Sequence, residues 1–200
     1  WNTNVINRYE TAASRLAARA AYERAYGQWK NRPTPGFSDI ALEVDLYPSE
    51  RRLESRGRAT LINRKDTAIT EFLLTTDPRL RVGQLAIEHG TITYEDATLG
   101  VRIYRFDPPL APHGTLQMQW SATRLNRGFV NSGADNEIVA NGTYVALGSI
   151  APWPAYDEDR ELTDAGERRR AGLPPAARLP ALGDAAWLNT LGSGTDGRSG

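Results

Sequence analysis

Cysteine is absent from the 200-residue chain, and its absence excludes disulfide frameworks, thiolate metal sites and cysteine nucleophiles together. An excess of either charge is absent too, because 24 basic residues balance 24 acidic ones. A neutral chain has no overall field that attracts nucleic acid or an anionic membrane, so either partner would need a local patch of charge. We therefore expect no nucleic-acid partner.

Long apolar runs and catalytic motifs are also absent. No stretch approaches the ~18 apolar residues that cross a bilayer, and the N-terminus lacks the order of a signal peptide, so we expect no membrane insertion by this segment. No HExxH, GxSxG, Walker loop or GxGxxG occurs, which weighs against an enzyme. The start at Trp1 and the Gly- and Ser-rich end indicate a piece of a longer protein.

What the sequence does contain is alternation of apolar and polar residues over 38–74. Aliphatic side chains occupy every second position of 40–46, and the alternation resumes at 53–61 after turn-forming residues at 48–52. A period of two predicts half-buried strands, each with one apolar face.

The second of these strands has a thin inner face in its middle. Gly57 and Ala59 leave room for a bulky side chain, which we expect to come from an opposing layer of a sandwich. A third strand is predicted at 69–74, after a polar turn too short for a helix. Short links between consecutive strands predict antiparallel pairing.

Further short strands are predicted downstream, each bounded by turn dipeptides, and the clearest of them places Trp120 in the core. One or two more strands are expected in 137–147, around the turn pair Asn141-Gly142. The sequence therefore predicts a mainly β protein, an antiparallel β-sandwich of about eight strands over 37–150. The other expected strands lie at 80–88, 91–95, 101–106 and 116–121.

A helix is predicted to precede the sandwich. Apolar residues recur at helical spacing over 4–29, many of them alanine, and Thr3 or Asn4 can cap the start. Residues 1–32 would then form a helix that lies across the sandwich through its aromatic residues or stands off it as a stalk. The aromatic residues are Tyr22, Tyr26 and Trp29.

Residues 151–200 are rich in proline and charge and cannot form the interior of a sheet. We interpret them as an extended arm with a flexible tail, which wraps either its own sandwich or a further domain. Asp164 and Glu167 mark the start of one short helix, stopped by Gly172. Trp153 and Tyr156 form a candidate interaction surface, although packing of Trp153 onto the sandwich is an equally good interpretation.

The remaining polar groups suggest no chemistry. His89 and His113 each precede a glycine and have no ligand partner at suitable spacing, so ordinary turn residues are the favoured interpretation over a metal or catalytic role. The carboxylates of 157–161 lack the glycine and the spacing of an EF-hand, which favours a solvated acidic loop over a calcium site. The basic run 168–170 favours a surface helix laced with ion pairs over a nucleic-acid patch.

Several ordered motifs carry a resemblance to a known family. The segment DIALEVDLYPSERRLESRGRATLIN is followed by GVRIYRFDPPLAPHGTL, RGFVNSG, NGTYV and DRELTDAGERRRAGLPPAARLPAL. This succession resembles the extracytoplasmic segment of bacterial membrane proteins that join ABC-transporter permease helices to an M1-type aminopeptidase. More loosely, the strand, turn and G-x-x-x-L pattern at 53–61 is similar to the N-terminal β domain of M1 zinc aminopeptidases.

The resemblance implies a scaffold rather than a catalyst. In that family zinc is held by HExxH and a downstream glutamate, and GxMEN helps to hold the substrate amine; neither motif occurs here, so no catalytic, cofactor-binding or metal residue carries over. Zinc is expected only in the absent catalytic domain. The implied partners are the catalytic and transmembrane parts of the parent chain and peptides, in the periplasm. The alternative is a stand-alone extracytoplasmic binding or adhesion module for peptide or glycan.

Overall fold

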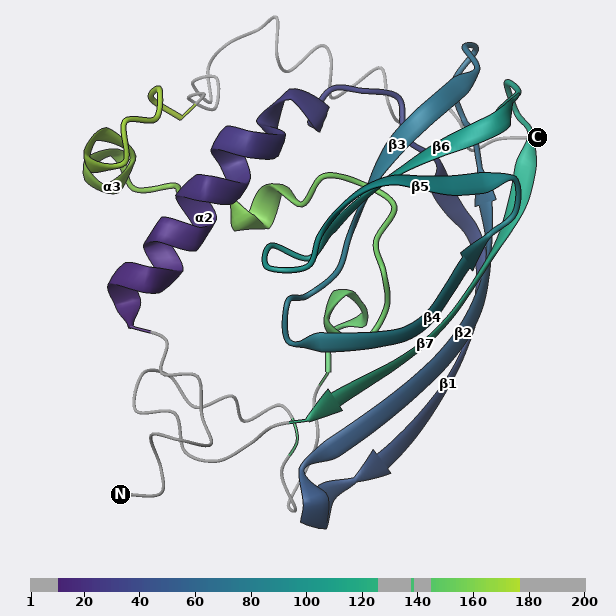
Figure 1. The fold of residues 1–200 in the computed structure, drawn as a ribbon, viewed down its shortest axis with the longest axis horizontal. Helices are drawn as coiled ribbons and strands as arrows, with labels where there is room; N and C mark the ends of the chain where they lie inside the picture. Colours follow the sequence, from purple (N-terminus) through teal and green to yellow (C-terminus); the bar gives the residue numbers. More distant parts are fainter. Residues whose placement is uncertain (1–10, 126–137, 139–144, 177–200) are drawn as a thin grey trace, which may run out of the picture. The chain divides into compact units, whose positions relative to one another are not determined.

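The computed structural model of the protein describes residues 11–125, 138 and 145–176. The chain divides into two compact units, residues 1–162 and residues 163–200, and each unit is described by itself. The first unit holds the described strands (Figure 1). They are β1 (Gly36–Tyr47), β2 (Arg52–Ile62), β3 (Ile69–Thr75), β4 (Leu80–Ile87), β5 (Gly90–Asp96), β6 (Val101–Leu110) and β7 (Thr115–Leu125).

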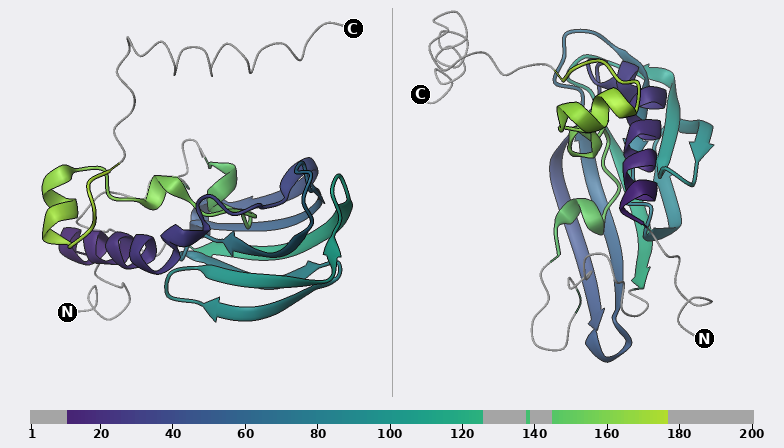
Figure 2. Two further views of the ribbon diagram at one scale, coloured as in Figure 1. Left: turned by 90° about the horizontal axis from the view of Figure 1, so that it is seen from above. Right: turned by 90° about the vertical axis from the view of Figure 1, so that its left-hand side faces the viewer.

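Two antiparallel sheets pack face to face in this unit (Figure 2). One has the strand order β1-β2-β7-β4 and the other β3-β6-β5. Both contribute to one buried cluster, with Leu61, Met118 and Trp120 from the first sheet and Phe72 and Tyr104 from the second. The prediction of a mainly β, antiparallel sandwich is confirmed, and Trp120 is a core residue as expected.

Strand β2 follows its predicted alternation along its whole length. Leu53, Ser55, Gly57, Ala59 and Leu61 are buried, whereas the residues between them are partly or fully exposed. The buried row faces the other sheet because successive side chains of a strand point to opposite sides.

The bulky neighbour of Gly57 comes from a different place than expected. A Cβ on Gly57 would lie 2.1 Å from a ring atom of Trp120, and Trp120 is the residue directly opposite Gly57 on the adjacent strand β7. The large ring therefore lies over the glycine within one sheet. The prediction of a side chain from the opposing layer is wrong, because a direct cross-strand pair is closer than the ~10 Å that separates stacked sheets.

The expected pairing of consecutive strands holds for β1 with β2 but not for β2 with β3. Strand β2 pairs with β1 and β7, whereas β3 pairs with β6 in the other sheet. The short link 63–68 therefore crosses between the layers. Asn63, fully buried, fixes this crossing, since its side-chain amide donates to carbonyl oxygens of the link, of Leu110 at the end of β6 and of Ala111, which follows it.

Strand boundaries differ from the prediction. Strand β6 continues beyond the predicted end at residue 106, through Pro108 and Pro109, to Leu110, and β7 continues beyond the predicted end at residue 121 to Leu125, so Arg124 lies in a strand. The described residues contain seven strands, in agreement with the prediction of about eight. Most of 137–147 lies outside the described residues, and its described part forms no strand.

Helix α2 (Ala12–Tyr26) and the 3-10 turn η1 (Gly27–Trp29) precede the sandwich. Thr11 caps the helix, because its side chain accepts a hydrogen bond from the N–H of Ser14 at 2.9 Å. The predicted caps, Thr3 and Asn4, lie outside the described residues. Thr11 itself has an extended backbone, with φ −73° and ψ 158°, so no helix runs unbroken through it and the prediction of one continuous helix over 4–29 is wrong.

The C-terminal half of α2 covers the outward face of the three-stranded sheet. Tyr22 and Tyr26 cluster there with Leu73 of β3 and Val101 of β6. The N-terminal half of the helix is exposed apart from half-buried Leu16. The helix therefore combines the two predicted arrangements, because one half lies on the sandwich and the other projects from it.

The second unit contains helix α3 (Ala165–Arg170). Asp164 caps it by accepting a hydrogen bond from the N–H of Glu167 at 2.8 Å, and the chain leaves it through Gly172 at φ +67°. The predicted short helix is confirmed at both ends. No helix in the part of the chain that the structure describes has the length and apolar character needed to cross a bilayer.

Candidate functional site: the strap and its exposed tryptophan

Residues 145–162, which we call the strap, run across the first unit and are held at both ends. Near its start, the carbonyl oxygen of Ile150 accepts a hydrogen bond from Ser55 of β2 at 2.7 Å. Further on, Trp153 pairs with Thr75 at the end of β3, with N–H···O distances of 2.8 Å in both directions. Because proline cannot donate to a ladder, the flanking prolines limit the pairing to this single bridge.

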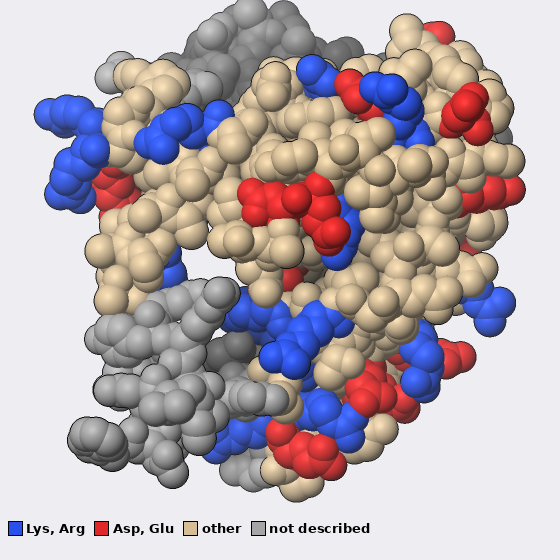
Figure 3. Space-filling model, viewed as in Figure 1, with Lys and Arg blue, Asp and Glu red and all other residues tan. Residues whose placement is uncertain are grey.

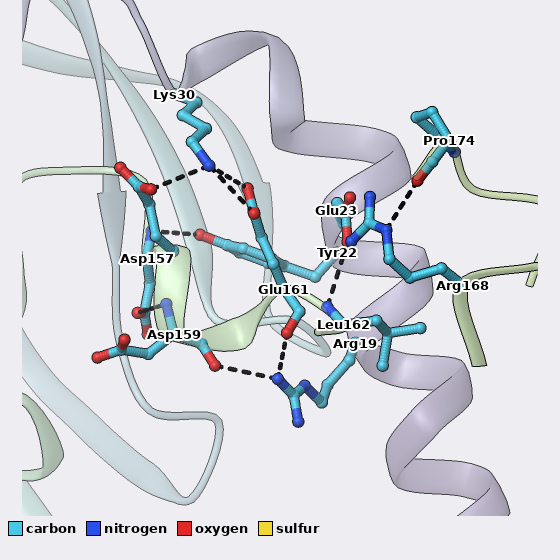
Figure 4. A network of polar contacts seen from close by, with 11 residues as sticks. Arg19, Tyr22, Glu23, Lys30, Asp157, Asp159, Glu161, Leu162, Arg168 and Pro174 are labelled. Carbon is cyan, nitrogen blue, oxygen red and sulfur yellow. Dashed lines mark hydrogen bonds and ion pairs between the residues drawn. The ribbon is translucent and has the colours of Figure 1, made fainter. Parts of the chain in front are cut away.

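Helix α2 binds the far end of the strap through Arg19 (Figure 4). The guanidinium donates to the carbonyl oxygens of Asp159 and Arg160, each at 3.2 Å, and also to that of Glu161. A guanidinium has donors in a planar fork and can engage several acceptors at once. One side chain therefore orders three successive residues of the strap.

Charged side chains reinforce this attachment. The ammonium of Lys30 lies 2.9 Å from the carboxylate of Glu158 and 3.1 Å from that of Glu161. The carboxylate of Glu23 accepts from the N–H of Leu162 at 3.3 Å. The acidic segment 157–161 is thus largely engaged with the helix that precedes the sandwich, rather than being a freely solvated loop.

Three stacked groups form the centre of the contact. The rings of Tyr22 and Tyr156 stack with centroids 5.0 Å apart, and the guanidinium of Arg160 lies 4.0 Å from the centroid of the Tyr22 ring. The Tyr22 hydroxyl accepts from the N–H of Asp157 at 2.8 Å. Burial raises the pKa of Tyr22, Tyr156 and Asp157 above their ordinary values, since each charged form would lose its hydration.

Of the two residues predicted to form an interaction surface, the structure exposes one. Trp153 is 42 % exposed and touches Phe37 edge-on, with the ring centroids 5.3 Å apart. Tyr156 is buried among Tyr22, Leu73 and Val101. The backbone pairing with Thr75 fixes the main chain of Trp153, and its ring contacts Phe37, so a partly exposed aromatic side chain is presented beside the end of β3.

In the part of the chain that the structure describes, no group of three or more His, Cys, Asp or Glu side chains is arranged so that it could hold a metal ion. Asp157 instead accepts from the N–H of Asp159 at 3.1 Å, which closes a local turn. His89 and His113 occupy turns with positive φ, 56° and 57°, as their position before glycine predicted. Their nearest carboxylates are exposed ones, on Glu88 and Asp66.

A small pocket of about 100 Å³ lies between the ends of the strands near Asp77, Glu95 and Arg102. Asp77 is an ion-pair partner of Arg79 at 2.7 Å and of the fully buried Arg124 at 3.4 Å. Burial disfavours the charged form of Asp77, but the hydrogen bonds and charges of these two arginines prevail and lower its pKa below the ordinary value. The charge of Asp77 is therefore engaged in holding the link between β3 and β4 against Arg124 of β7.

Sequence reasoning missed Arg19, Lys30 and Arg124 as structural residues. Arg124 stands in register with the buried row of β7, two residues after Ala122 and four after Trp120, so the alternation itself contained the signal. Arg19 lies three residues before Tyr22, and Lys30 lies four residues after Tyr26. Nothing in the sequence indicated that the strap is the partner of either residue.

On the face shown in Figure 3, basic and acidic side chains are intermixed.

Fold and site together define an antiparallel β-sandwich module with a helix-bound strap and an exposed aromatic residue. No family model and no curated protein matches the sequence. Among solved structures, a mutant M1 zinc metallopeptidase from Deinococcus radiodurans bound to a Tyr-Ser-Ala substrate is 14% identical, over 47% of this chain and 21% of that chain, with a TM-score of 0.36.

A second solved structure, a two-domain M1 zinc metallopeptidase mutant bound to L-tryptophan, is also 14% identical with a TM-score of 0.36, over 52% of this chain and 23% of that chain. The chain thus spans less than a quarter of the length of either structure. Similarity at this level does not establish a family. The sandwich fold described above follows from the strand pairing of this chain itself.

Proposed function

We propose that this chain is a non-catalytic β-sandwich module of an M1-like zinc metallopeptidase region joined to an ABC-type permease. In this role it is a scaffold that docks the catalytic domain and forms one wall of a peptide cleft. It lies on the extracytoplasmic side of a bacterial inner membrane. Its partners are the catalytic and transmembrane parts of its parent chain, and the zinc belongs to the catalytic domain.

The observation that supports the proposal is structural. The segment that resembles the M1 β domain supplies residues that build the sandwich. In the segment 39–63, Leu53 and Leu61 are fully buried, and Gly57 provides the space for Trp120. Asn63 donates to the carbonyl oxygens of Thr67, Leu110 and Ala111 at 2.8, 3.2 and 3.1 Å. Leu61 packs in the core between the sheets, Gly57 lets β2 and β7 pack closely within one sheet, and Asn63 fixes the crossing between the sheets, so these residues shape the framework, which is what a scaffold requires of them.

The test begins with the coding sequence that adjoins this segment. The proposal expects an HExxH motif with a distal glutamate and permease-like helices in the same chain. Expression of that region with and without residues 1–176 should then give chelator-sensitive release of an N-terminal amino acid only when the module is present. A parent without the zinc motif, or chelator-sensitive turnover by the present chain alone, would overturn the proposal.

A second candidate function is a stand-alone extracytoplasmic binding module, favoured by the exposed ring of Trp153 and the pairing of its backbone with Thr75. If this is the function, the isolated chain should bind short peptides or chito- and cello-oligosaccharides with a change in tryptophan fluorescence. Trp153→Ala should abolish the change, whereas Leu147→Ala, at a residue that is 36 % exposed elsewhere on the strap, should retain it. No change with any of these probes would remove this candidate.

A further inference from the structure

Four strands form the edges of the two sheets, and three of them are interrupted or covered. The register shifts in the middle of β4 between Val82 and Gln84, and in the middle of β5 between Ile92 and Tyr94. Strand β3 is irregular at its start and meets the strap at Thr75. Bulges and covering segments are the devices by which proteins prevent unwanted pairing at an edge.

Strand β1 lacks this protection over most of its length. Its single register shift lies near its start, between Phe37 and Asp39, and the pairing with β2 is regular from Asp39 to Tyr47. Among the described residues β2 is its only strand partner. Every second N–H and C=O of this stretch therefore points away from β2, to a side where none of the described strands pairs with it, and such an edge is a template for another extended chain.

The inward row of β1 is apolar and becomes exposed along the strand. Ile40 and Leu42 pack against the main core, but Val44 and Leu46 are 39 % and 45 % exposed. An added strand would place alternate side chains beside these two residues and cover them. Apolar side chains are therefore needed at alternate positions of the partner.

The outward row of β1 is acidic. Its charged residues are Asp39, Glu43 and Asp45, and the strand has no lysine or arginine. On the β2 side, Arg56 pairs with Asp45 at 2.6 Å and lies 3.6 Å from Glu43. On the free side, an antiparallel second copy of β1 would bring these carboxylates near one another, whereas basic side chains would be attracted.

We propose that the edge of β1 from Asp39 to Tyr47 binds an extended segment that alternates apolar with basic residues and adds to the sheet as a further strand. The apolar side chains of the segment cover Val44 and Leu46, and its basic side chains face the carboxylates of the outward row. Main-chain hydrogen bonds supply affinity, and the two rows supply selectivity. The inference is independent of the proposed function.

The test uses the whole chain and a blocked, fluorescein-labelled peptide in which arginine alternates with valine and leucine. Fluorescence anisotropy should show saturable binding to the wild-type chain. The same peptide with backbone N-methyl groups on the ladder-forming amides, and a counterpart with glutamate in place of arginine, should each bind at least about tenfold more weakly.

Two variants of matched exposure locate the site. Leu46 and Ile92 are both 45 % exposed on edge strands. Leu46→Lys should weaken binding at least about tenfold and Ile92→Lys should leave it within about twofold, since only the first lies on β1. Val44→Lys provides a second variant on β1 should Leu46→Lys lower the melting temperature.

Several results would overturn the proposal. They are equal binding by the N-methylated peptide, equal weakening by Ile92→Lys, or no saturable binding. A dimer in sedimentation velocity that Leu46→Lys dissociates would also overturn it, because the edge would then be occupied by a second copy of the chain.

Discussion

The two sheets of the sandwich differ in how many of their faces are covered. The three-stranded sheet packs on the core with one face and on α2 and the strap with the other, so Phe72 and Leu73, adjacent on β3, are both buried in different clusters. In the part of the chain that the structure describes, the four-stranded sheet packs against other elements through one face only, and the outward residues of β7 include Gln117, Gln119 and Ser121. The sequences reflect this difference: β3 reads FLLT without interruption, whereas β2 and β7 alternate.

The comparison shows what the N-terminal helix and the strap contribute. Without them, the outward face of β3 and β6 would expose Leu73 and Val101, which are almost fully buried in the structure. The aromatic residues of α2 and Tyr156 remove that face from water, and the burial of apolar area is the main favourable term in such packing. The helix and strap therefore act as a third layer over one sheet.

The strongest test of this difference between the sheets is to truncate Phe72 and Leu73, the two neighbours on β3. Phe72→Ala should lower the free energy of unfolding by about 3–5 kcal/mol, because Phe72 is fully buried between the sheets. Leu73→Ala should cost about 2–4 kcal/mol, since it leaves a cavity beneath α2. Urea unfolding followed by circular dichroism measures both. A cost of well under 1 kcal/mol for Leu73→Ala would show that the third layer does not contribute to stability.

Gly57 tests the packing inside the four-stranded sheet. Gly57→Ala should destabilise the protein by about 1–3 kcal/mol, because the added Cβ would overlap the ring of Trp120. Trp120→Leu removes that overlap while it creates its own cavity, so the cost of Gly57→Ala should fall in the Trp120→Leu background. A double-mutant cycle measures this coupling. Additive costs would mean that the backbone yields rather than the ring, and would contradict the close packing described here.

Much of the fold could be predicted because its signals are local. Periods of two located β1, β2 and β7, and Asp164 and Gly172 marked both ends of α3. The partner of each strand could not be predicted in the same way. A short link after Ile62 is compatible with a hairpin or with a crossing to the second sheet, and the choice depends on the buried amide of Asn63, whose acceptors are up to 48 residues away.

The site was less predictable than the fold for a related reason. The exposure of Trp153 could be anticipated from its flanking prolines, but the burial of Tyr156 depends on its stacking with Tyr22, 134 positions earlier in the chain. The bonds from Arg19 to the strap use carbonyl oxygens, which every residue has, so no side-chain pattern in the strap announces them. Contacts of a side chain with a distant backbone leave no signature in a single sequence.

The ion pair of Asp77 with Arg124 ties the link between the two sheets to β7, and it makes the stability of the sandwich depend on pH. The pKa of Asp77 is lowered in the folded chain, so its contribution to stability is present above the unfolded pKa of about 4 and is lost as the pH falls through the folded value. Asp77→Asn should cost roughly 1–3 kcal/mol at pH 7, because it removes a charged hydrogen-bond acceptor. Urea unfolding between pH 7 and pH 3 should show a shallower loss of stability in acid for the variant. Parallel curves would exclude Asp77 as a source of acid sensitivity.

The smallest expected effect lies on the uncovered face of the four-stranded sheet. Gln119 is exposed on β7, opposite Arg58 of β2, and it is the immediate neighbour of the core residues Met118 and Trp120. Gln119→Ala should change the free energy of unfolding by no more than about 0.5 kcal/mol, since it removes neither a buried contact nor a cap. Met118→Ala, one residue away on the covered face, serves as the control and should cost about 2–5 kcal/mol. A loss of more than about 1 kcal/mol in the free energy of unfolding on Gln119→Ala, growing with protein concentration, would contradict this expectation. This face would then be buried against another copy in solution, and the contrast between the two sheets would hold only for the isolated chain.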